Sequence, residues 1–223
     1  MHIEPGVVTG AKLALSVATA AGGFALTAKM AWATARESGF GVLGARAVAT
    51  TALVFAFFQI LPHFPVGVSE VHFILGSTLF LLFGGGAASI GLAMGLLIQG
   101  LFFAPFDLPQ YGMNVTTLIV PLWAVSELAK RIIAPGTAYV DLTYVQALKL
   151  STAYQGGVVA WVAFWAFYGQ GFGAANLAAV ASFGAAYMSV ILLEPLADLA
   201  VLGIAKSAKG LASRPIFEKR LLA

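Results

Sequence analysis

Long apolar runs recur along almost the whole chain, each close to the length that a helix needs to cross a membrane. The first, GAKLALSVATAAGGFALTA, covers residues 10–28, and further runs cover residues 52–61 with an approach from Arg46, 71–83, 87–103, 115–133, 151–169 and 174–193. About 20 predominantly apolar residues form a helix that spans a hydrocarbon core of roughly 30 Å. The sequence therefore predicts an all-α integral membrane protein, built as a single bundle of about seven transmembrane helices.

The composition excludes a separate soluble domain. Hydrophobic residues make up 60% of the 223 residues and charged residues only 9%, whereas soluble domains carry roughly 25% charged residues. We therefore expect one membrane domain over residues 1–223. Because Pro195 interrupts the last apolar run, residues 196–223 are predicted to form a tail within that domain.

The third apolar run is the weakest candidate for a crossing. VHFILGSTLFLLF is short, so it spans the membrane as a helix only if that helix begins near Val66. Prolines in PHFPVG end the preceding helix, and the glycines at 84–86 separate this run from the next one.

Lysine and arginine predict the orientation of the bundle. With an odd number of helices, nearly all of them fall on one face: Lys29, Arg36, Arg46, Lys130, Arg131, Lys149, Lys206, Lys209, Arg214, Lys219 and Arg220. Only Lys12 lies near the opposite face. The positive-inside rule places the C-terminus in the cytoplasm and the N-terminus outside, in a multi-pass protein of the plasma or inner membrane.

This orientation places all three histidines on the outer side, together with Glu4, Glu70, Asp107 and Asn114. His63 lies between two prolines, where a solvated loop residue is the commoner situation. His72 lies inside an apolar segment, where a polar side chain has to face the protein interior or a cavity and is a functional candidate.

His2 follows the initiator methionine, and this position has a specific chemistry. Because Glu4 and Pro5 precede the first apolar run, we expect no cleaved signal peptide and a retained Met1. The free amine, the amide nitrogen and the imidazole of His2 can then close a five-membered and a six-membered chelate ring on one ion. The planar peptide unit keeps these three nitrogens near one plane and leaves a fourth corner, for which His72 is the natural ligand. Such a nitrogen set suits Ni²⁺ or Cu²⁺, with Co²⁺ also plausible.

The opening MHIEPG resembles the N-terminal signature of the CbiM/NikM family, the cobalt and nickel substrate-binding membrane components of energy-coupling factor transporters. The stretch VSEVHFILGSTLFLLFGGGAASIGLAMGLLIQGLFF is similar to the central segment of the family, and YGMN resembles its Leu-Gly-Ala-Asn stretch. One departure concerns the loop that often reads Gly-Asp-Gly-Gly or Gly-His-Gly-Gly in relatives, which here reads APFDLPQ. The resemblance implies a metal site formed by Met1, His2 and His72, with Asn114 supporting these ligands.

Family membership also implies function and partners. The chain would bind Ni²⁺ or Co²⁺ as the substrate-specific component of an ABC transporter, with the ion as transported substrate and no catalytic cofactor. Its partners would be a transmembrane coupling subunit and two cytoplasmic ATPases. Whether a small accessory membrane subunit is also needed stays open. The chain contains no phosphate-binding Gly-x-x-x-x-Gly-Lys-Ser/Thr motif, so ATP hydrolysis is expected from separate subunits.

Two alternatives stay open at this point. A component for an organic vitamin would use Trp161, Trp165 and Tyr168, although these aromatics are more often lipid-facing or interfacial residues. An intramembrane metal-dependent enzyme is less favoured, because the His-Glu-x-x-His motif of zinc hydrolases is absent.

The predicted topology can be tested with reporters that are active only in the cytoplasm. A reporter fused after Ala223 should be active, and one inserted near Gly171 should be silent, because only the first position follows an odd number of crossings. The reverse pattern of activity would overturn the predicted helix count.

Overall fold

The structure is a computed structural model that describes residues 2–190, 192–193, 196–197, 200–201 and 204. Within these residues it contains seven α-helices, a short two-stranded hairpin and three short 3-10 helices, one of which is η2, between α4 and α5. Their bounds are α1 Leu13–Ser38, α2 Phe40–Gln59, β1 Phe64–Val66, β2 Ser69–Val71, α3 Gly76–Phe83, α4 Gly85–Phe102, η2 Pro105–Gln110, α5 Tyr111–Ile132, α6 Tyr144–Gln170 and α7 Ala174–Val190. The predicted tail 196–223 lies almost entirely outside the described residues.

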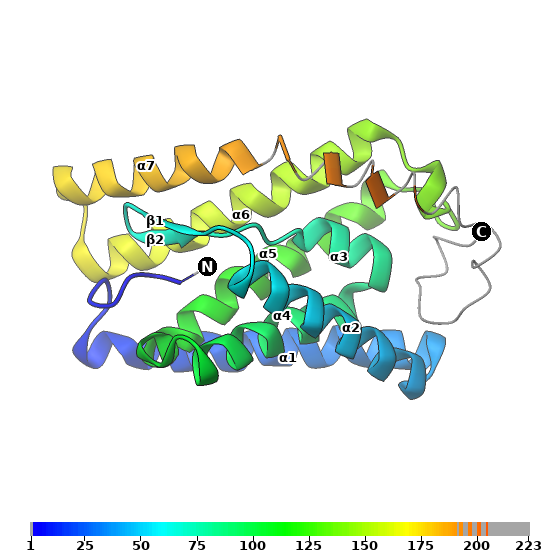
Figure 1. Ribbon diagram of the computed structural model, residues 1–223, viewed down its shortest axis with the longest axis horizontal. Coiled ribbons are helices and arrows are strands. Elements are labelled where there is room, and N and C mark those ends of the chain that lie inside the picture. The colour runs from blue at the N-terminus through cyan, green and yellow to red at the C-terminus, as the bar shows by residue number, and fades with distance from the viewer. Residues whose placement is uncertain (1, 191, 194–195, 198–199, 202–203, 205–223) are drawn as a thin grey trace.

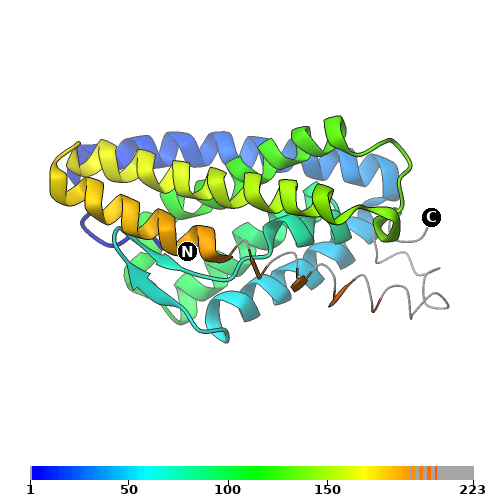
Figure 2. The same cartoon turned by 90° about the horizontal axis from the view of Figure 1, so that it is seen from above.

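The helices run side by side along the long axis of the molecule, and the hairpin lies against α7 (Figures 1 and 2). Four of the described helices are long and apolar enough to cross a membrane. Glycines with positive φ make the tight reversals, with φ of 90° at Gly39 between α1 and α2 and 85° at Gly84 between α3 and α4. The predicted all-α membrane bundle is therefore confirmed.

The expectation for the third crossing is wrong in its details. The helix begins at Gly76 rather than near Val66, and its eight residues are only about 12 Å long. Residues 64–71 instead form the hairpin, in which Phe64 pairs with Val71. Backbone that is not helical is tolerated at membrane depth only where protein covers it. All eight residues of α3 are buried, as are Ile74 and Leu75 before it.

The closest helix pair is α2 with α4, and glycines on α4 allow this approach. A Cβ atom on Gly91 would collide with the side chain of Thr50, and one on Gly95 would lie 2.6 Å from Cγ1 of Val54. Small residues at helix interfaces let membrane helices pack closely enough for van der Waals contact along their length. This packing fixes the C-terminal part of α4, which carries Gln99, against Phe58 of α2.

Helix α6 begins with a capping box and carries the aromatic residues considered above. The side chain of Thr143 accepts a hydrogen bond from the backbone N–H of Gln146, whose side chain accepts one from Thr143 N–H. Trp165 is fully buried, so the expectation that it faces lipid or the interface is wrong. Trp161 donates a hydrogen bond to Thr116 Oγ1 at 3.0 Å and thereby joins α6 to α5.

The α2–α4 contact can be tested by adding a side chain at Gly91. Gly91→Leu should destabilise the protein by about 1–3 kcal/mol, because the new side chain has to displace Thr50 and its backbone. Gly22→Leu is the control, since a Cβ atom there meets nothing within 4 Å. The measurement is the thermal unfolding midpoint in detergent, and equal midpoints for the two variants would contradict the close packing.

Candidate metal centre

The N-terminal segment lies against strand β2 as a short additional strand. Ile3 forms a β-bridge with Ser69, and the carbonyl oxygen of His2 accepts two hydrogen bonds, from Glu70 N–H at 2.9 Å and from Ser69 Oγ at 2.8 Å. Glu4 N–H donates in turn to Val68 O at 3.1 Å. This pairing brings the start of the chain beside a segment nearly seventy residues away in the sequence.

Asn114 holds the same segment from the other side. Its Oδ1 atom accepts a hydrogen bond from Ile3 N–H at 2.8 Å, and the side chain is buried at the start of α5. The structure thus places Asn114 where it positions the residue that follows His2. Its predicted supporting role stays a prediction, and the contact that it makes is to Ile3 backbone rather than to an imidazole.

The imidazole of His2 has a defined tautomer. Its Nε2 atom lies 2.7 Å from Gln99 Oε1, and Gln99 Nε2 donates to Phe58 O at 3.4 Å. Because the Gln99 amide nitrogen donates to the Phe58 carbonyl, the Gln99 oxygen faces His2, and this oxygen can only accept a hydrogen bond. His2 Nε2 therefore carries the proton, and the lone pair of the neutral ring lies on Nδ1.

Burial favours this neutral ring. His2 is only 3% exposed, and desolvation lowers its pKa from 6.5 to about 3. A metal ion therefore does not compete with a proton for Nδ1 at neutral pH. Within the described residues, Nδ1 also has no hydrogen-bond partner.

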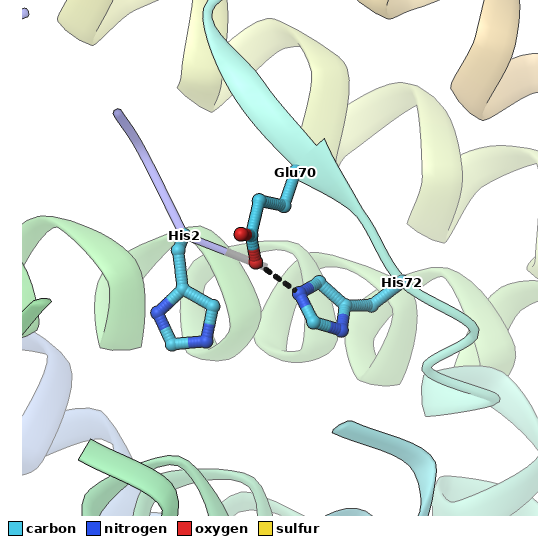
Figure 3. Close-up of side chains that lie close together, drawn as sticks. All are labelled: His2, Glu70 and His72. Carbon is cyan, nitrogen blue, oxygen red and sulfur yellow. Dashed lines mark hydrogen bonds and ion pairs between the residues drawn. The ribbon is translucent and has the colours of Figure 1, made fainter. Parts of the chain in front are cut away.

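His72 lies beside His2 and is paired with Glu70. Its Nε2 atom is 2.8 Å from Glu70 Oε2, its side chain is fully buried, and its backbone oxygen accepts a hydrogen bond from the Tyr187 hydroxyl at 3.0 Å. The ring centroids of His2 and His72 are 5.3 Å apart. One donor atom from each of His2, Glu70 and His72 lies within 4.8 Å of the other two (Figure 3).

His63 lies in a loop, as its position between prolines suggests, but its ring also contacts the site. Its ring stacks on that of His72, with centroids 4.8 Å apart and an interplanar angle of 14°, and it is half-buried. It does not belong to the three-residue group of potential ligands found within the described part of the chain. His63 therefore covers one face of the His72 ring.

The structure brings together two of the three predicted ligands, His2 and His72, and adds residues that the sequence did not single out as contacts. Met1 lies outside the described residues, so the predicted amine ligand is not placed. The sequence placed Glu70 and Asp107 on the same face as the histidines but predicted no contact for them, and Gln99 was not considered. Gln99 lies in the apolar run LLIQG, where an isolated polar residue is itself a signal for an interior role.

Comparison with known proteins places the chain in a family. Residues 2–210 match the family CbiM, described as the cobalt uptake substrate-specific transmembrane region. No curated protein and no solved structure gives a significant match. The family describes transport rather than catalysis, and it implies cobalt as the transported substrate. Because the match covers nearly the whole sequence, this multi-pass membrane protein belongs to the CbiM family of cobalt uptake substrate-specific transmembrane regions.

Proposed function

We propose that this protein captures a divalent cobalt or nickel cation at the His2–His72 centre and is the substrate-binding component of an energy-coupling factor transporter. The observation that carries the proposal is that the buried rings of His2 and His72 lie beside each other, with centroids 5.3 Å apart, and that the partly buried carboxylate of Glu70 adjoins both. Two buried imidazoles with a carboxylate beside them suit binding of a divalent ion.

His2 is the central ligand of the proposal. Through its Nδ1 lone pair and its own amide nitrogen it closes a six-membered chelate ring, which Nε2 cannot reach. Because Nε2 donates its hydrogen bond to Gln99, the lone pair of Nδ1 stays available to the ion. Hydrogen bonds of this kind, from the nitrogen that does not bind the metal, orient metal-binding imidazoles. The amine of Met1 completes the five-membered ring in the proposed chelate.

His72 supplies the fourth nitrogen in the proposed site. The Glu70 carboxylate accepts a hydrogen bond from its ring and makes that ring a more basic ligand. Nitrogen donors around a tetragonal ion suit nickel, and cobalt accepts the same ligands.

The proposed partners follow from the energy requirement. Uptake against a gradient needs ATP hydrolysis, and the sequence has no phosphate-binding loop of its own. We therefore assign the ATPase activity to two cytoplasmic subunits, joined to this chain through a transmembrane coupling subunit. A vitamin as the cargo is less favoured, because Trp165 is packed in the core and Trp161 is bonded to Thr116.

The amino-terminal chelate predicts that the position of His2 matters as well as its identity. A Gly-Ser-Gly-Ser extension before Met1 should lower Co²⁺ retention nearly as much as His2→Ala, because the free amine is then no longer within reach of the ion. The same four residues added after Ala223 provide the control. Metal content per protein after gel filtration is the measurement, and full retention in the N-terminally extended protein would rule out the amine as a ligand.

Substitutions of His72 and His63 should differ sharply in their effect on cobalt affinity. His72→Ala should lower cobalt affinity by about 10–100-fold or more, because it removes a ligand. His63→Phe keeps an aromatic ring stacked on His72 and removes only the nitrogens, so affinity should stay close to that of the native protein. Isothermal titration with Co²⁺ measures both, and equal losses would show that His63 is itself a ligand.

A further inference from the structure

A carboxylate lies beside the metal-binding nitrogen of His2. Asp107 Oδ2 is 3.1 Å from His2 Nδ1, and the two side chains are only 5% and 4% exposed. Asp107 comes from η2, immediately after α4, the helix that carries Gln99. The two elements are joined by hydrogen bonds from Ala104 N–H to Gln99 O and from Asp107 N–H to Ala104 O, both 3.0 Å long. One junction thus supplies contacts to both nitrogens of the His2 ring.

The contact between Asp107 and His2 is not a hydrogen bond. Although the distance is short, the carboxylate oxygen lies off the direction in which Nδ1 would donate or accept, and Nδ1 has no hydrogen-bond partner. The Gln99 contact already sets the ring orientation and puts the lone pair on Nδ1. Two electron-rich atoms in a buried site are favourable neighbours only when a positive charge lies between them.

This geometry is the one expected of two ligands bound side by side to one ion. Donors that are each about 2.1 Å from an ion and at right angles to one another lie about 3 Å apart. In that arrangement the nitrogen lone pair points at the ion, and the neighbouring oxygen lies off the lone-pair direction. The spacing and the off-axis approach of Asp107 match both conditions.

We propose that Asp107 is a further ligand, which binds the ion through a carboxylate oxygen beside His2 Nδ1 and selects Co²⁺ over Ni²⁺. The inference rests on the proposed chelate at His2. Four nitrogens in one plane suit Ni²⁺, whose low-spin form binds axial ligands weakly, whereas Co²⁺ accepts a fifth donor. The carboxylate also offsets part of the positive charge of an ion in a buried site.

The experiment compares Asp107→Asn and Asp107→Leu with the native protein in equimolar Co²⁺ and Ni²⁺. Both variants should shift the ratio of bound metals toward nickel by about tenfold or more, the effect expected for loss of a contact that tunes a metal site. Asp141→Asn, the same chemical change at an exposed position, should leave the ratio unchanged. Thermal unfolding of each variant shows that it is folded.

A second readout reports the coordination number directly. Co²⁺ in the native protein should give the visible absorption spectrum of a five-coordinate ion, because Asp107 supplies a fifth ligand. In Asp107→Leu the spectrum should change to that of a four-coordinate ion bound by nitrogens alone. An unchanged spectrum together with an unchanged metal ratio would overturn the role of Asp107.

A His2→Ala arm separates this inference from the proposed function. If His2→Ala abolishes metal binding and the Asp107 variants keep the native metal ratio and Co²⁺ spectrum, the chelate stands and Asp107 is not a ligand. If His2→Ala retains the metal, the proposed function itself fails. Equal weakening of both metals in the Asp107 variants would contradict selection of cobalt.

Discussion

The site depends on the pairing of the first residues of the chain with strand β2. Hydrogen bonds from Glu70 N–H and Ser69 Oγ to the His2 carbonyl, and from Glu4 N–H to Val68 O, fix the backbone from His2 to Glu4. Because this backbone also carries the proposed amide ligand, the pairing orients the ligand and the imidazole together. A terminal segment is ordinarily poorly ordered unless it is tied down in this way. Its place beside strand β2 gives the proposed ligand His2 a fixed backbone position.

The two ring nitrogens of His2 contact different side chains, and the two contacts differ in kind. Gln99 binds the protonated Nε2, whereas Asp107 lies beside the unprotonated Nδ1. The amide of Gln99 can act in this way because its own nitrogen is engaged by Phe58 O. The chemistry of the ring is thus set by helix α4, which packs closely on α2 through glycines. A membrane-helix contact controls which atom is available to an ion.

The sequence predicted the bundle because apolar runs are a strong signal in a membrane protein, and it predicted the neighbourhood of His2 and His72 because both lie on the same predicted face. It could not predict the third crossing, where the hydropathy of residues 71–83 predicts one helix but the chain is not helical before Gly76. Nor could it assign Gln99 and Asp107 to the two ring nitrogens. Such contacts depend on how α4 and η2 meet the N-terminal segment, and side-chain pairing between distant segments leaves no periodic pattern.

The non-helical backbone before α3 also has a consequence for the biogenesis of the protein. Residues 69–75 cannot satisfy their backbone groups as an isolated segment in lipid, and the His72 carbonyl accepts a hydrogen bond from the Tyr187 hydroxyl of α7. The ribosome has to complete α7, the last of the named helices, before this hydrogen bond can form. The surroundings of His72 are therefore completed late in synthesis.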